Sequence, residues 1–189
     1  AALAIGSKFL LRYRGKHIFN PANFALVTMM LVSDHVWVSS GQWGSAAIGA
    51  FVLACLGSLV LSRAKRAETT IAFIVFYAAL VFGRAVWLDE PFSIALHQLQ
   101  NGALLIFAFF MISDPKTTPN TSLGRVLYAA LVVSVAGTIQ FIYYQPNGPI
   151  LALIMCAPAV PLIDALFKGR IYRWKQAADQ KIGSIKGAF

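Results

Sequence analysis

Polar side chains interrupt the apolar stretches of this sequence at three places, and the first is built around an Asn-Pro pair. Residues 16–24 read Lys-His-Ile-Phe-Asn-Pro-Ala-Asn-Phe. Pro21 removes a backbone donor and biases Asn20 away from helix, so the pattern predicts a broken start of a helix that Asn20 caps. The alternative role is chemical: a helix start carrying Asn20 and Asn23 beside basic side chains could offer hydrogen-bond donors to an electron-rich or anionic group.

The second place lies inside the apolar run 92–112. His97, Gln100 and Asn101 stand at i, i+3 and i+4, which predicts that they share one helical face, with Gln98 beside them. Gly102 leaves room for a flat molecule to approach. Amide and imidazole groups suit hydrogen bonding to such a molecule, and packing partners inside a helix bundle are the alternative. Haem ligation by His97 is disfavoured, because no second His stands at helical spacing in the same run.

The third place is the segment 113–121, which reads Ser-Asp-Pro-Lys-Thr-Thr-Pro-Asn-Thr. The prolines predict a second broken helix, at Asp114-Pro115, followed by an Asx/ST-type turn. Asp114, Thr117 and Thr118 give this turn more hydrogen-bonding groups than its length requires. The segment is therefore a candidate binding element as well as a turn.

Apolar runs must position these groups, and six of them approach the length of about 20 residues that crosses a bilayer. We predict an all-α, polytopic transmembrane bundle of about six full spans plus a partial N-terminal one at 3–11. Pro158 and Pro161 should distort the last span, leaving Asp164 near its end to pair with Lys168 or Arg170. The expected full spans are 18–33, 45–61, 69–88, 92–112, 124–143 and 148–167.

The distribution of basic residues gives these spans a direction. Of the sixteen Lys and Arg residues, all except Arg84 fall in alternate connections or in the C-terminal tail. Cytoplasmic loops of inserted helices are enriched in this way. We therefore expect a multi-pass membrane protein with residues 34–44 and 84–91 outside and the C-terminus in the cytoplasm.

Composition excludes several other classes of protein. The chain is 58% hydrophobic and only 12% charged, and its net charge of +9 sits in short clusters, which favours contact with the lipid bilayer over nucleic-acid binding. Cys55 and Cys156 form no metal motif, so no metal site is expected from this chain alone. We expect a transmembrane domain over 1–175 and a cytoplasmic basic tail over 176–189. The chain starts without Met, so either it is N-terminally truncated or its first apolar run is a half-helix. Truncation is favoured, because a lone partial span would leave backbone groups unsatisfied in lipid.

Taken in order, these clusters resemble the NqrB/RnfD family: membrane subunits of the sodium-pumping NADH:quinone reductase and of the Rnf electron-transport complex. The resemblance covers roughly residues 7–175. It rests on Phe-Asn-Pro-Ala in the first cluster and Phe-Met-Ile-Ser-Asp-Pro before the third, with further matches at 7–12, 101–103, 124–125, 161–164 and 170–172. It implies an all-helical fold, itself similar to urea and ammonium channels, that carries flavin and passes electrons between redox partners.

One departure from the family concerns the cofactor. Family members carry FMN covalently on the Thr of an Asp-x-x-Ser-Gly-Ala-Thr signature that follows the Asn-Pro-Ala helix, on the outer side. Here residues 33–44 read Ser-Asp-His-Val-Trp-Val-Ser-Ser-Gly-Gln-Trp-Gly, and the chain contains no such signature. Covalent FMN is therefore not expected, whereas non-covalent riboflavin or FMN remains open.

The resemblance and the polar clusters together lead to a functional hypothesis: an integral membrane electron-transfer subunit of a multisubunit redox complex, with other membrane subunits and a quinone as partners. The non-covalent flavin should lie in the cytoplasmic half, near the third cluster. A small-solute transporter or channel of related fold and a cofactor-free scaffold subunit are the alternatives. The expected flavin-binding residues are Asn20, Asn23, His97, Asn101, Asp114, Thr117 and Thr118.

Overall fold

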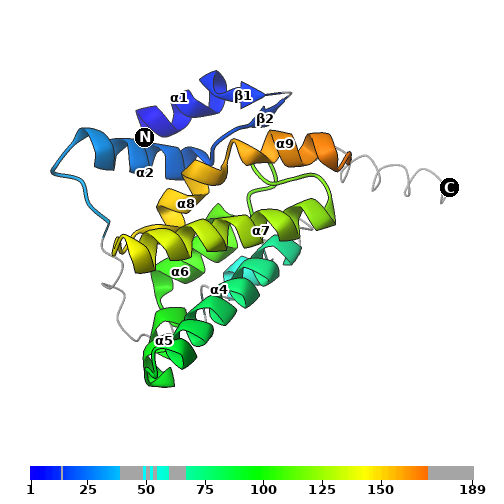
Figure 1. The fold of residues 1–189 in the computed structure, drawn as a ribbon. Helices are drawn as coiled ribbons and strands as arrows, with labels where there is room; N and C mark the ends of the chain where they lie inside the picture. The colour runs from blue at the N-terminus through cyan, green and yellow to red at the C-terminus, as the bar shows by residue number, and fades with distance from the viewer. Residues whose placement is uncertain (14, 39–48, 50–51, 53–54, 60–66, 170–189) are drawn as a thin grey trace.

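The computed structural model describes residues 1–13, 15–38, 49, 52, 55–59 and 67–169. Figure 1 shows α1, a short β-hairpin, α2 and α9 along one side of the molecule, α4 and α5 along the opposite side, and α7 between them. The expected span 45–61 lies largely outside the described residues, and the expected tail 176–189 lies wholly outside them.

The N-terminal part is a short helix, a hairpin and a second helix. Helix α1 (Ala2–Leu10) corresponds to the expected partial run at 3–11. Strands β1 (Arg12–Tyr13) and β2 (Lys16–His17) pair antiparallel. Gly15 permits their tight turn with a φ of +82°, a backbone conformation that costs other residues more. This hairpin is a small addition to the all-α architecture that the sequence predicts.

The start of α2 (Pro21–Val32) confirms the predicted capped helix. Asn20 has an extended backbone, and its Oδ1 accepts hydrogen bonds from the backbone N–H groups of Ala22 and Asn23 at 3.1 and 3.2 Å. Pro21 occupies the first helical position, where its missing N–H leaves nothing unsatisfied. At 12 residues, α2 is shorter than a helix needs to cross a membrane.

Two helical segments are each long and apolar enough to cross a membrane. They are α4 (Ala67–Trp87) and the continuous segment made of α7 (Ser122–Gly137) and the π-helix η2 (Thr138–Ile142). Each has 21 residues, which corresponds to roughly 30 Å of helix. Their Leu, Val and Phe side chains cover both faces, as buried or lipid-facing helices require.

The other two apolar segments are bent pairs of helices. α5 (Phe92–Leu99) meets α6 (Gly102–Ile106) and the π-helix η1 (Phe107–Met111) at 49°, and α8 (Gly148–Cys156) meets α9 (Ala159–Leu166) at 54°. The second bend lies at Pro158, as predicted. If each pair is one span, the described residues contain up to four spans, fewer than the expected six.

The first bend corrects the sequence interpretation of the second polar cluster. Helix α5 ends at Leu99, and Asn101 adopts an extended backbone with φ −66° and ψ 123°. The Asn101 Oδ1 then accepts from Ala103 N–H at 2.9 Å and begins a new helix. Asn101 therefore does not continue the helical face that carries His97, because its side chain satisfies a backbone donor and ends the periodicity.

The core lies where α4 packs on α7 and α7 packs on α8. Phe73, Val132 and Ala136 are fully buried there. Gly148 opens α8 against α7, and a Cβ added to it would lie 2.7 Å from the carbonyl oxygen of Ala136. The small residues at this contact bring the two backbones close together, as in other membrane helix pairs.

Candidate functional site

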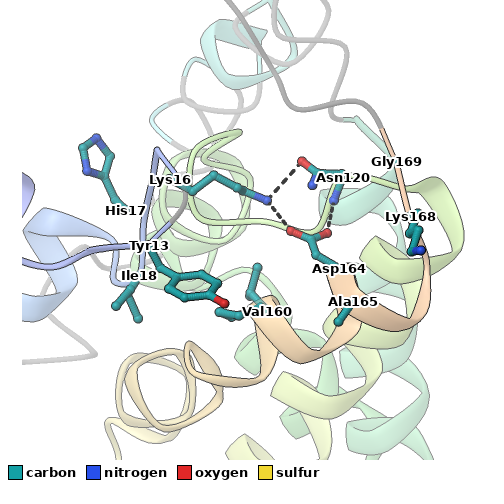
Figure 2. Close-up of a pocket in the computed structure, with 11 residues that line it drawn as sticks. Tyr13, Lys16, His17, Ile18, Asn120, Val160, Asp164, Ala165, Lys168 and Gly169 are labelled. Carbon is teal, nitrogen blue, oxygen red and sulfur yellow. Dashed lines mark hydrogen bonds and ion pairs between the residues drawn. The ribbon is translucent and has the colours of Figure 1, made fainter.

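A buried lysine joins the hairpin to two other parts of the molecule. Lys16 Nζ donates to Asn120 Oδ1 at 3.1 Å and to Asp164 Oδ2 at 2.8 Å (Figure 2). It also donates to Thr118 O at 2.6 Å. Its side chain is only 11% exposed, and that of Asp164 is 16% exposed. An ammonium group removed from water to this extent needs its charge compensated and its three donors used, and both conditions are met.

Residues at and just before the start of α7 also contribute to this junction. The second carboxylate oxygen of Asp164 accepts from Asn120 N–H at 2.7 Å, so Asp164 holds both Lys16 and the third polar cluster. Arg125 forms an ion pair with Glu68 at the start of α4 and also donates to Asn120 O at 2.9 Å. The expected pairing of Asp164 with Lys168 is wrong, because Asp164 pairs with Lys16. The alternative partner, Arg170, lies outside the described residues, so that pairing stays a prediction.

A cavity of about 470 Å³ opens beside this junction, between the hairpin and α9; we call it the hairpin cavity. Figure 2 shows the Tyr13 ring extending from the hairpin toward Val160 and Asp164, whereas the His17 ring points away from Asp164. The cavity combines an apolar wall with two ammonium groups, a carboxylate, an imidazole and an amide. Its lining residues are Tyr13, Lys16, His17, Ile18, Asn120, Val160, Pro161, Asp164, Ala165, Lys168 and Gly169.

His17 lies at the edge of this cavity in an unusual state. Its Nδ1 is buried and has no hydrogen-bond partner among the described residues. Burial lowers the pKa of His17 below its ordinary value, and the positive charge of nearby Arg12 lowers it further. The imidazole is therefore neutral at pH 7.

The predicted residues of the third cluster lie next to the hairpin cavity but do not line it. The hydroxyls of Thr117 and Thr118 both donate to Asp114 O, at 3.3 and 3.0 Å, and Asp114 Oδ1 accepts from Lys116 N–H at 2.9 Å. These bonds form the predicted Asx/ST-type turn. The turn has a supporting role: it holds the Thr118 carbonyl and the Asn120 side chain toward Lys16.

The two predicted asparagines of the first cluster are also buried in structural contacts. Asn20 Nδ2 donates to Met111 O at 3.2 Å, which ties the start of α2 to the end of η1. Asn23 Nδ2 donates to Ile150 O at 3.1 Å, which ties α2 to α8. Of the side-chain polar atoms of these two asparagines, Asn23 Oδ1 is buried without a partner among the described residues.

The remaining predicted residues, His97 and Asn101, separate. His97 is exposed on α5, whereas Asn101 lines a second cavity of about 230 Å³, which we call the amide cavity. It lies between α4, the α5–α6 bend, η2 and the start of α8. Its lining residues are Val38, Tyr77, Gln98, Asn101, Ala103, Leu104, Phe107, Gln140, Pro146, Asn147, Pro149 and Ile150.

Sequence reasoning missed several groups that form these two cavities. It did not pair Lys16 with Asp164, and it did not single out Asn120, Gln140 or Asn147. For Lys16 and Asp164 a hint existed, because both stand at the ends of apolar runs where an unpaired charge would be costly. For Gln140 and Asn147, no local pattern indicates that they meet across the bundle.

Comparison with known proteins agrees with this architecture. Residues 32–173 match the model of the NQR2, RnfD, RnfE family. The chain is 28% identical over 138 residues to the D subunit of the ion-translocating oxidoreductase complex of Escherichia coli O1:K1 / APEC, which covers 72% of this chain and 34% of that protein. It is 37% identical over 75 residues to the protein of the same name from Tolumonas auensis, which covers 40% of this chain and 22% of that one.

The chain thus spans about a third of the length of the Escherichia coli relative that it matches. The family match itself covers well over half of the chain and includes α4 to α9 with both bent pairs. On this evidence, the chain belongs to the NQR2, RnfD, RnfE family.

Proposed function

We propose that this chain is the electron-transfer membrane subunit of an ion-translocating oxidoreductase complex and that it holds a non-covalent flavin in the hairpin cavity. The family supports the first part, since its named relatives are the D subunits of such complexes. The hairpin cavity is the observation that supports the second part. Its volume falls within the range of about 300–1,000 Å³ that is usual for small-molecule sites.

The groups around the hairpin cavity match the chemistry of a flavin ring. Ile18, Val160 and Pro161 provide an apolar wall, and Tyr13 provides an aromatic surface. The Lys168 ammonium group is a donor suited to the electron-rich pyrimidine edge of the ring, whereas the donors of Lys16 are used within the fold. A bound flavin supplies reversible electron transfer, and the Lys168 ammonium group would favour its reduced, anionic form.

The two lysines have different parts in this proposal. Lys16 is fixed by three hydrogen bonds and keeps its charge in place. Lys168 is exposed at the end of α9, so it can adjust to a ligand without disturbing the fold. The turn that contains Asp114, Thr117 and Thr118 would keep the cavity in shape when no ligand is bound.

The orientation follows from the charges. Lys8, Arg12, Lys16 and Lys168 belong to the end that carries the hairpin and α9, and we propose that this end faces the cytoplasm of a bacterial inner membrane. Electrons would then pass between the hairpin cavity and other membrane subunits or a quinone at this face. At the opposite end of the molecule, the last turn of α4 carries Arg84, and the charge of Arg84 is paired with that of Glu90.

The direct test is the flavin content of the purified chain and of two pairs of variants. Lys168→Met and Tyr13→Ala each remove a cavity group and should lower the amount of flavin in an acid extract. Lys116→Met and Tyr143→Ala remove the same groups at positions that do not line the cavity, and they should leave flavin content unchanged. Folded protein from flavin-supplied cells that yields no flavin would contradict the proposal.

A further inference from the structure

The amide cavity is a second, chemically different space in the same molecule. It shares no lining residue with the hairpin cavity. Of the described residues that line it, none is charged, and its polar side chains are Tyr77, Gln98, Asn101, Gln140 and Asn147. A cavity with five neutral hydrogen-bonding side chains inside an apolar bundle is costly to leave empty.

The decisive observation is that oxygens at this cavity are unsatisfied. Gln98 Oε1 and Asn147 Oδ1 are buried and have no hydrogen-bond partner among the residues that the structure describes. Asn23 Oδ1 is also buried without a partner among the described residues. Asn23 lies next to Ile150, since its Nδ2 donates to the Ile150 carbonyl. All three are acceptors. Since buried polar groups are nearly always paired, the missing partner is a molecule that brings donors.

The other polar groups restrict the occupant further. The Tyr77 hydroxyl donates to Gln140 Oε1 at 2.9 Å, so this pair is already matched. Asn147, Pro149 and Ile150 line the cavity at the N-terminus of α8, so the positive end of the α8 dipole faces it. That end disfavours a cation and favours an acceptor atom. The occupant should therefore be uncharged and carry both donors and an acceptor.

The volume sets the size of the occupant. At about 30 Å³ for each water molecule, 230 Å³ corresponds to roughly seven water molecules or one small solute. We propose that the amide cavity binds a small uncharged solute with at least two N–H donors and one carbonyl acceptor, that is, a primary amide or a urea-like molecule. Its N–H groups would satisfy Gln98 and Asn147, and its carbonyl would face the start of α8.

The test compares three probes of the same shape on the purified chain in lipid nanodiscs. Acetamide has the donors and the acceptor, acetone lacks the donors, and acetate lacks the donors and carries charge. Saturation-transfer NMR should detect binding of acetamide only. Gln98→Leu and Asn147→Leu should each weaken acetamide binding about tenfold. Gln145→Leu, at an exposed position outside the cavity, is the matched control and should bind as the unchanged chain does.

Three outcomes would overturn the proposal. Equal binding of acetone would show an apolar pocket, and sodium-dependent broadening of the ²³Na signal that Gln98→Leu abolishes would show a cation site. Acetamide binding that neither leucine variant weakens would place the solute elsewhere. Ala103→Leu fills the cavity without changing its amide side chains, and it should abolish acetamide binding. This variant tests the proposal independently if Gln98→Leu or Asn147→Leu fails to fold. The test does not depend on flavin, because flavin-free protein serves equally well.

Discussion

The two cavities differ in how their polar groups are satisfied. At the hairpin cavity, Lys16 makes three hydrogen bonds and both carboxylate oxygens of Asp164 are used. At the amide cavity, Gln98 and Asn147 each leave a buried oxygen without a partner in the described part of the chain. A buried charge must be paired within the fold, whereas a buried amide oxygen without a hydrogen-bond partner costs less free energy.

This difference separates two kinds of polar residue in a membrane protein. The charged junction around Lys16 joins segments that are far apart in sequence, so its main effect should be on stability. The amide cavity contributes less to holding the helices together, so its side chains should affect binding more than folding. The predictions below run from the largest expected effect to the smallest.

Breaking the Lys16–Asp164 pair should have the largest effect. Asp164→Leu leaves the Lys16 ammonium buried without its counter-charge, and we expect a loss of about 3–5 kcal/mol in the free energy of unfolding. Reversible unfolding in mixed SDS micelles measures it. The double variant Lys16→Met/Asp164→Leu should recover part of the loss, because no unpaired charge remains.

The matched control for the Lys16–Asp164 pair is a more exposed ion pair near the C-terminal end of α4. Arg84 and Glu90 also form an ion pair, at 2.7 Å, but their side chains are 31% and 29% exposed. Arg84→Gln should therefore cost only about 0–1 kcal/mol. Equal losses for Asp164→Leu and Arg84→Gln would remove the distinction between a charged junction and a surface pair.

The contact behind the amide cavity should tolerate no added atom. Gly148→Ala places a Cβ 2.7 Å from the Ala136 carbonyl oxygen, which is backbone and cannot rotate away. We expect a loss of about 1–3 kcal/mol in the same unfolding measurement. In Gly83→Ala the new Cβ meets nothing within 4 Å, so that variant should be neutral or slightly stabilising.

Removing either asparagine cap should lower the stability by a smaller amount, and Asn20 should matter more than Asn101. Asn20→Ala removes two accepted bonds and the donated bond to Met111, and it should cost about 1–2 kcal/mol. Asn101→Ala removes the acceptor that caps Ala103 and should cost about 1 kcal/mol. Asn20→Ser keeps a capping oxygen and loses the Met111 bond without burying a charge. If it were as unstable as Asn20→Ala, the cap would not be the source of the effect.

The state of His17 predicts the direction of a pH effect. Its folded pKa lies below 6.5 because of burial and then Arg12, so the unfolded chain takes up a proton first as pH falls. Stability from this group is thus present above about pH 6.5 and declines as pH falls toward the folded pKa. His17→Gln should flatten this part of the stability profile, whereas an unchanged profile would assign the titration to another group.

Local patterns predicted part of this structure correctly. Asn20 followed by Pro21 indicated a capped helix start, and Pro158 indicated the bend between α8 and α9, because each acts on its own backbone. The bend at Asn101 was missed for the opposite reason. Periodicity extends a helix through any residue that lacks a strong breaker, and here an asparagine side chain ended it by bonding to Ala103.

Long-range pairings could not be read from the sequence. Lys16 and Asp164 are 148 residues apart, and Asp164 had a basic residue nearby in Lys168, which made a local partner the simpler expectation. The same limit applies to the amide cavity, where Gln98, Gln140 and Asn147 come from three separate segments. Only the packing of the helices brings such groups together.

The most direct measurement of the proposed function is the side from which the flavin can be reduced. Dithionite, which does not cross membranes, is added to vesicles of either orientation that contain the purified chain with its flavin. A flavin in the hairpin cavity should be bleached rapidly when the hairpin end faces the reductant, and slowly in the opposite orientation. Rapid bleaching only from the Trp87 end of α4, with flavin content unaffected by Lys168→Met, would contradict the placement of the flavin in the hairpin cavity.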